Sequence, residues 1–176
     1  MAMRGDAKSL SFVEDTAVAP ERLRDYIERF LRMIREHGSS SGVYAHASVG
    51  CLHVRPVLNL RLDKDLKAMR TIAEAAFAFV REYKGSHSGE HGDGLCRSEW
   101  VAWQYGPRLK QAFAQVKALF DSGNRMNPGK IVNSPPMTTN QNLASHSPSC
   151  SSWCIRVLMP SPPGRVGRTC SRRRRT

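Results

Sequence analysis

The sequence predicts an α+β fold of the ferredoxin-like type, an antiparallel sheet that carries its helices on one face. Two long segments, residues 20–38 and 63–85, have apolar residues at helical spacing. Four short segments predicted as strands flank them in the order β-α-β-β-α-β. That order is typical of the split βαβ arrangement, whose second sheet face is free to cover a ligand. At 176 residues the chain is long enough for one such domain and its core.

The first strand is predicted over residues 9–14, which mix β-branched and aromatic side chains. The first helix follows, because Pro20 suits a first helical turn and Gly38 suits the position just past a helix end. One face of this helix is apolar, and its residues are Leu23, Ile27, Phe30, Leu31 and Ile34. The helix is therefore amphipathic and must pack against another element.

Residues 43–46 and 52–58 are predicted as the second and third strands, with a bend near Gly50. Asp63 is a candidate N-cap of the second helix and Gly85 a candidate stop. The apolar face of this helix comprises Leu66, Met69, Ile72, Ala73, Ala76, Phe79, Val80 and Tyr83. A short fourth strand is predicted over residues 86–90, running into a glycine-rich loop.

The remaining segments complete a predicted domain over residues 9–133. Residues 97–105 are predicted to be helical, and Pro107 opens a further helix that ends near Phe120. Residues 134–176 are rich in Pro, Ser and Arg, have no sustained periodicity, and are predicted to be disordered. The abrupt change of composition suggests a shifted reading frame in this tail, a hypothesis that sequencing the source DNA would test.

The basic charge is concentrated in the same tail. The net charge is +12, and residues 134–176 hold seven arginines and no acidic residue. Arginine contacts to phosphate make a nucleic-acid-binding protein the alternative interpretation. The body has neither a zinc finger nor an RNP-like motif, so we expect no specific nucleic-acid recognition. No apolar run approaches the ~20 residues that span a bilayer, and no signal-peptide core is present, which predicts a cytoplasmic protein.

A candidate metal site lies between residues 46 and 94. His46 and His53 are seven residues apart, and Glu90 lies in a segment that reads Ser-Gly-Glu-His-Gly-Asp-Gly. Two imidazoles and a carboxylate suit zinc, iron or manganese and leave a coordination position for substrate. Because seven is an odd separation, the two histidines share a face only if the chain turns or bulges between them.

Three further residues near this site have a functional and a structural interpretation. In extended chain His91 points away from its neighbour Glu90, so it is a candidate general base facing a substrate. Arg55 lies two residues beyond His53 and is either a fork for a substrate carboxylate or a surface arginine. Cys51 is either a further ligand or a small buried hydrophobe. A metal-dependent hydrolase using the same ligands is also compatible with the spacing.

Residues 9–133 resemble the C-terminal domain of FAD-linked oxidases in the vanillyl-alcohol-oxidase superfamily, which includes D-lactate, glycolate and D-2-hydroxyglutarate dehydrogenases. The resemblance rests on motifs in a fixed order, namely Phe-Val-Glu-Asp-Thr-Ala-Val at 12–18, the histidine pair followed by Val-Arg-Pro, the Ser-Gly-Glu-His-Gly-Asp-Gly loop at 88–94, and Asn-Pro-Gly-Lys at 127–130. The His-Val-Arg-Pro form is most similar to the large bacterial branch of the family.

The resemblance implies a role for each matching residue. It implies that His46, His53 and Glu90 bind a divalent metal, that His91 is the catalytic base, and that Asn127 and Lys130 lie beside FAD. It also implies a 2-hydroxy-acid substrate whose α-carbon delivers hydride to the flavin.

The sequence departs from the family in two ways. Many members have Asp-Gly-Asn between the histidines, where this chain has Val-Gly-Cys at 49–51. The FAD-binding half that precedes this domain in the family is not in the sequence. We therefore expect a fragment that is inactive alone and that pairs with a separate FAD-binding domain.

Overall fold

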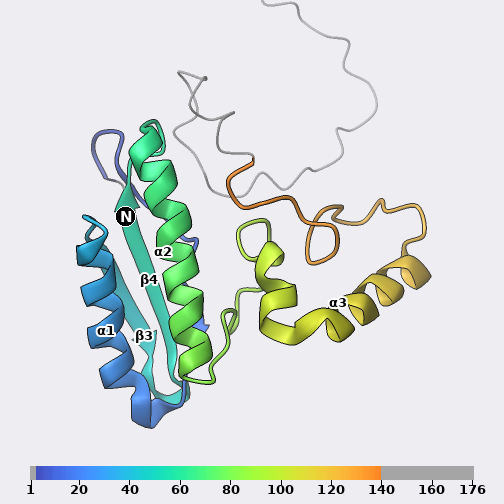
Figure 1. Cartoon of the computed structure of the whole chain (residues 1–176), viewed down its shortest axis with the longest axis horizontal. Coiled ribbons are helices and arrows are strands. Elements are labelled where there is room, and N and C mark those ends of the chain that lie inside the picture. Colours follow the sequence, from blue (N-terminus) through green and yellow to red (C-terminus); the bar gives the residue numbers. More distant parts are fainter. Residues whose placement is uncertain (1–2, 140–176) are drawn as a thin grey trace, which may run out of the picture.

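The computed structural model describes residues 3–139, in which two long helices cover one face of an antiparallel sheet (Figure 1). The helices are α1 (Leu23–Glu36) and α2 (Asp63–Glu82). The strands are β1 (Lys8–Ser9), β2 (Thr16–Ala17), β3 (Ser41–His46) and β4 (Cys51–Leu58). The predicted α+β class is confirmed.

The strand β4 lies at the centre of the sheet. β3 pairs with it antiparallel along one edge, and β1 and β2 pair antiparallel with opposite ends of its other edge. Ala17 in β2 then forms an isolated antiparallel bridge with Ser86. Across the sheet, β3 lies at one edge and β4 lies next to it. β1 and β2 together take the third place, and the segment at Ser86 takes the fourth. This order is the ferredoxin-like arrangement.

The prediction of one continuous first strand over residues 9–14 is wrong in its extent. Ser9 pairs with Val57 and Thr16 pairs with Leu52, so seven steps along the first segment face five steps along β4. The two extra residues form a bulge, which ends at Asp15 with a φ of +76°. Because the bulge breaks the pairing, the side chains of Glu14 and Asp15 are free to reach the loop beyond Ser86.

The turn between β3 and β4 depends on a glycine. A 3-10 turn (Ala47–Val49) leads into Gly50, whose φ is +67°. A Cβ atom built on Gly50 would lie 1.8 Å from the carbonyl oxygen of Val18, and the Val18 N–H donates to the Gly50 carbonyl at 3.1 Å. Both the left-handed conformation and the close backbone approach exclude a side chain here.

We expect Gly50→Ala to lower the free energy of unfolding by about 2–3 kcal/mol, because the strained φ and the clash with the Val18 carbonyl add. Urea unfolding followed by circular dichroism measures the loss. Gly42→Ala is the matched control, since Gly42 lies in β3 with open space around it. Alanine in a strand is favoured over glycine by roughly 0.5–1 kcal/mol. Equal effects at the two positions would contradict this account of the turn.

The helices and the sheet enclose one core. Along β4 alternate residues point to opposite faces, and Leu52, Val54 and Leu58 are buried in the hydrophobic cluster formed with the helices. α1 buries Leu23, Tyr26, Phe30, Met33 and Ile34, and α2 buries Met69, Ile72, Ala73, Ala76, Phe77 and Val80. The opposite face of the sheet is the one that carries the histidines.

Details of both helices differ from the sequence patterns. The N-cap of α2 is Leu62 rather than Asp63. Asp63 is instead the first helical residue, and its carboxylate lies favourably near the positive end of the helix dipole. Phe77 is fully buried, whereas the predicted core residue Phe79 is only partly buried and stacks on the Arg29 guanidinium at 4.9 Å.

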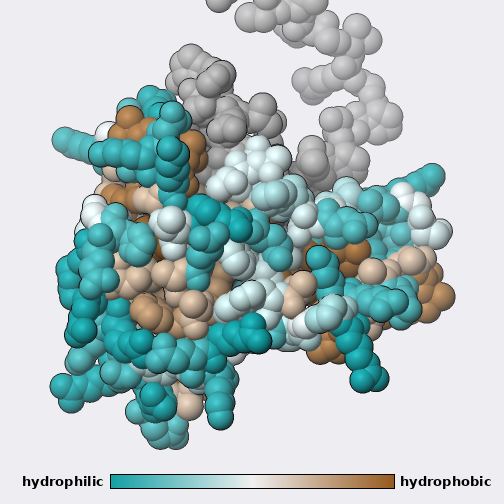
Figure 2. All heavy atoms as spheres, viewed as in Figure 1, coloured by the Kyte–Doolittle hydropathy of each residue, from teal (hydrophilic) through white to brown (hydrophobic). Residues whose placement is uncertain are grey.

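The C-terminal helical segment extends away from the sheet (Figure 1). The two predicted helices form α3 (Val101–Phe120), interrupted at Gly106 (φ 81°, ψ 168°), after which Pro107 opens the second half. Apolar side chains gather over α3 in the space-filling view (Figure 2). Those most exposed in its second half are Leu109, Val116, Leu119 and Phe120. No helix within residues 3–139 combines the length and apolar character needed to cross a membrane.

Packing continues past residue 133, the predicted end of the domain. Met137 is buried in the hydrophobic cluster, and its backbone N–H donates to the carboxylate of Glu99. The disorder is predicted over residues 134–176, and of these residues 140–176 lie outside the described part of the chain. The seven arginines of the predicted nucleic-acid contacts all fall in that undescribed range.

Candidate metal centre

The hairpin of β3 and β4 brings His46 and His53 to one face of the sheet. His46 pairs with Cys51, and His53 lies two residues further along β4, so all three side chains share that face. The centroids of the two imidazole rings are 5.1 Å apart. The predicted turn between the histidines is therefore present, and it places them on neighbouring strands.

Asp15 anchors the loop that supplies the carboxylate. The backbone N–H of Gly89 donates to the Asp15 carbonyl at 2.7 Å. The N–H groups of Glu90 and His91 each donate to the Asp15 carboxylate at 2.8 Å. The predicted fourth strand over residues 86–90 is consequently wrong beyond Ser86, because this aspartate takes the N–H groups that a strand would give to the sheet.

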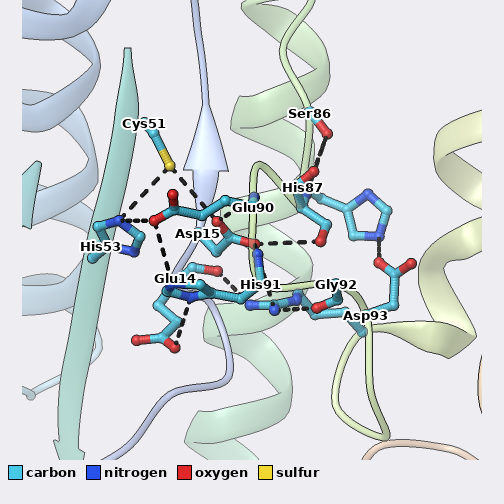
Figure 3. A network of polar contacts seen from close by, with 12 residues as sticks. Glu14, Asp15, Cys51, His53, Ser86, His87, Glu90, His91, Gly92 and Asp93 are labelled. Atoms are coloured by element: carbon cyan, nitrogen blue, oxygen red, sulfur yellow. Dashed lines mark hydrogen bonds and ion pairs between the residues drawn. The ribbon is translucent and has the colours of Figure 1, made fainter. Parts of the chain in front are cut away.

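Three imidazoles converge on one oxygen of Glu90, and Figure 3 shows two of them, those of His53 and His91. The Nε2 atoms of His46, His53 and His91 lie 3.2, 3.0 and 3.2 Å from Glu90 Oε1. Potential ligand atoms of His53, Glu90, His91 and Asp15 all lie within 4.8 Å of one another. His91 reaches the same place as Glu90 because residues 87–93 bend instead of remaining extended.

These donors fit a divalent cation. Two N or O ligands about 2.1 Å from one metal ion are separated by about 3.0–3.4 Å, the range of the contacts around Glu90. A single carboxylate oxygen has few lone pairs for three imidazoles, whereas a cation beside it would accept lone pairs from His46 and His53. His53 Nδ1 is buried without a hydrogen-bond partner among residues 3–139, so no hydrogen bond there fixes the imidazole tautomer.

The electrostatics favour a neutral imidazole beside a charged carboxylate. Burial lowers the pKa of His53, and nearby His91 lowers it further despite Glu90 and Asp15. Burial on its own would raise the pKa of Asp15, but the N–H groups of His91 and Glu90 and the Arg97 charge outweigh it and hold that pKa below its usual range. Neutral imidazole is the form that donates a lone pair to a metal.

Glu14 contacts both His91, the candidate general base, and Arg55, the candidate ligand of the substrate carboxylate. Its Oε1 lies 3.5 Å from His91 Nδ1, and its Oε2 accepts a 2.6 Å hydrogen bond from Arg55 Nε. Arg55 also donates to the Tyr44 hydroxyl at 2.9 Å, and its guanidinium lies over the Tyr44 ring. Arg55 thus lies on the predicted face, oriented by an acid and an aromatic residue.

Sequence reasoning did not assign roles to Glu14 and Asp15. Both lie in the Phe-Val-Glu-Asp segment, and adjacent acidic residues ending an apolar strand were the available signal. Their partners in the loop, Glu90 and His91, are about 75 residues away, which a local pattern does not reveal.

Arg97 holds the far side of the loop, where His87 and Asp93 lie close together. His87 is fully buried, and its Nε2 lies 3.0 Å from Asp93 Oδ1. Arg97 donates to the carbonyl oxygens of Glu14, at 2.6 Å, and Gly92. The loop is therefore fixed on both sides of Glu90 and His91.

The predicted flavin contacts lie apart from this cluster. Asn127 and Lys130 follow α3, and Lys130 Nζ lies 3.5 Å from Asn127 Oδ1. The Ile131 N–H donates to Ser98 Oγ at 2.7 Å and ties this segment to the start of α3.

Residues 1–131 match the family model of FAD linked oxidases, C-terminal domain. The chain is 41% identical over 128 residues to a D-2-hydroxyglutarate dehydrogenase of Pantoea ananatis, covering 73% of this chain and 12% of the relative. It is 41% identical over 133 residues to a D-2-hydroxyglutarate dehydrogenase of Escherichia coli strain K12, covering 76% and 13%. Identity to a D-lactate dehydrogenase of Archaeoglobus fulgidus is 29% over 132 residues, covering 75% and 29%.

The chain thus spans about an eighth of the length of the first two relatives, and its match covers the sheet, the loop and the histidine–carboxylate cluster. Because the family model matches residues 1–131, the chain belongs to the family of FAD-linked oxidase C-terminal domains.

Proposed function

We propose that this chain supplies the metal-binding and substrate-binding residues of a flavin-dependent dehydrogenase that oxidises a 2-hydroxy acid to a 2-oxo acid. The observation that carries the proposal is the convergence of His46, His53 and His91 on Glu90 Oε1, each within 3.2 Å. The names of the relatives, D-2-hydroxyglutarate and D-lactate dehydrogenase, support the substrate class.

His46, His53 and Glu90 would hold the cation. Zinc, manganese or iron bound there would make the hydroxyl of a chelated 2-hydroxy acid more acidic. The rigid hairpin and the Asp15 anchor preorganise the three ligands, which lowers the entropic cost of binding.

His91 would take the hydroxyl proton. Its side chain is 40% exposed, so substrate can reach it, and Glu14 lies on its other nitrogen and would stabilise the protonated ring. The α-carbon would lose hydride to the flavin, which balances the reaction as a two-electron oxidation with reduced flavin as product. Asn127 and Lys130 are proposed flavin contacts, and a separate FAD-binding domain would hold most of that cofactor.

Metal binding to the full 176-residue chain tests the proposal. After loading with Zn²⁺ or Mn²⁺ and desalting, elemental analysis should find about one metal per chain, and far less in a His46→Ala/Glu90→Ala variant. Circular dichroism verifies that both chains are folded. Equal metal content in the two chains would overturn the proposed function.

Arg55 is expected to bind the substrate carboxylate. In the metal-loaded chain, Arg55→Lys should weaken binding of D-2-hydroxyglutarate or D-lactate about tenfold, because lysine cannot form the bidentate contact. Isothermal titration calorimetry measures the affinity. The control is Arg61→Lys, since Arg61 pairs with Asp6 at the surface. A substrate affinity unchanged by Arg55→Lys would remove this residue from the substrate site.

A further inference from the structure

The sulfur of Cys51 lies beside the proposed metal ligands. Its side chain is buried on the histidine face of β4, with Sγ 3.8 Å from His53 Nε2 and 3.6 Å from Asp15 Oδ1 (Figure 3). A Cβ atom on Gly89 would lie 3.0 Å from this sulfur, so the glycine lets the loop pass close over it. Sγ and Glu90 Oε1 therefore both lie beside the same nitrogen of His53.

The spacing suits a shared metal ion. A zinc ion about 2.3 Å from sulfur and about 2.1 Å from nitrogen separates these ligand atoms by roughly 3.1–3.8 Å, for bond angles between about 90° and 120°. The observed 3.8 Å falls at the upper end of that range. The distance between Sγ and Nε2 therefore permits both atoms to bind one cation.

We propose that Cys51 is a further ligand of this centre and makes it select zinc-like ions, Zn²⁺ and Co²⁺, over Mn²⁺. This inference rests on the proposed function, because it assumes that the histidine–carboxylate cluster holds a cation. Nitrogen and oxygen donors alone accommodate manganese and iron, whereas a soft thiolate favours zinc. On binding, the sulfur–metal bond replaces the S–H bond that donates to Asp15, and the proton leaves to solvent.

The added ligand remains compatible with substrate binding. His46, His53, Glu90 and Cys51 would give a cation two nitrogens, one oxygen and one sulfur. Zinc in catalytic sites can expand to five ligands, so the substrate hydroxyl can still enter. Without a metal, the same thiol is a buried hydrogen-bond donor to Asp15. The experiment must distinguish this structural role from the role of a metal ligand.

Cobalt absorption spectroscopy tests the inference. In every chain Cys150, Cys154 and Cys170 are replaced by serine, so that Cys51 and Cys96 are the remaining thiols. Titration with Co²⁺ should produce visible ligand-field bands together with a near-ultraviolet sulfur-to-cobalt charge-transfer band. Cys51→Ser should abolish the near-ultraviolet band and keep the visible bands, while the matched Cys96→Ser variant should keep both. The preference for Zn²⁺ over Mn²⁺ should fall at least about tenfold in Cys51→Ser.

The outcomes separate the two claims. Visible bands without a charge-transfer band in the chain that retains Cys51 would overturn the role of Cys51 and leave the metal centre in place. No cobalt spectrum in any chain would overturn both. X-ray absorption of the zinc-loaded chain with Cys51 intact provides a measurement that does not depend on the folding of Cys51→Ser. A sulfur shell at about 2.3 Å supports the inference in a Cys96→Ser background, and a shell of N and O alone contradicts it.

Discussion

Glu90→Gln is expected to weaken binding of Zn²⁺ or Mn²⁺ at least about 100-fold, which corresponds to about 3 kcal/mol. Glutamine keeps the size of the side chain but removes the negative charge, and Oε1 of Glu90 is the atom on which three imidazoles converge. A cation held by His46 and His53 would then lack its neutralising carboxylate. Competition with a chromophoric chelator measures the affinity in the full chain.

The control for this prediction is Glu28→Gln. Glu28 pairs with Arg24 one turn away on the exposed face of α1, and this pair includes none of the proposed metal ligands. Its replacement should leave the metal affinity unchanged and the stability within about 0.5 kcal/mol. Affinities that differ less than about threefold between Glu90→Gln and the unaltered chain would show that the metal binds elsewhere.

Asp15→Asn should lower the free energy of unfolding by about 3–5 kcal/mol at neutral pH. The buried carboxylate accepts the N–H groups of Glu90 and His91 and lies 3.6 Å from the Arg97 guanidinium. Asparagine has one acceptor oxygen in place of two, so an N–H would face an amide NH2 and Arg97 would lose its charged neighbour. Urea unfolding measures the change.

The same variant has a predicted pH dependence. Burial opposes ionisation of Asp15, but the two N–H donors and Arg97 hold its pKa below the ordinary value of 3.8. Its stabilisation is therefore fully present above about pH 3.8 and is lost as the pH falls through the lower, folded-state pKa. The stability gap between the unaltered chain and Asp15→Asn should narrow in acid.

The exposed pair of Asp6 with Arg61 provides the control, because Asp6→Asn should change stability by less than about 1 kcal/mol. A gap that stays constant from neutral to strongly acidic pH would contradict the role of Asp15.

Local patterns predicted the elements whose formation is itself local. The apolar periodicity located α1 and α2, Gly50 located the hairpin turn, and Pro107 located the second half of α3. In each case the deciding interactions connect residues within a few positions of one another, and a one-dimensional pattern records them. The motifs at residues 46–53 and 88–94 also led to the family that the comparison with known proteins then showed.

The sequence by itself determined the order of strands and helices, the amphipathic faces that make them pack, and the residue types able to bind a cation. The tertiary structure decided that the first strand bulges by two residues, that Asp15 draws the loop after Ser86 off the sheet, and that Glu14, Glu90 and Cys51 lie beside histidines of one cluster. The physical reason is the separation along the chain. Contacts between residues 14–15, 51–53 and 90–91 join segments that are far apart along the chain, so no local preference encodes them.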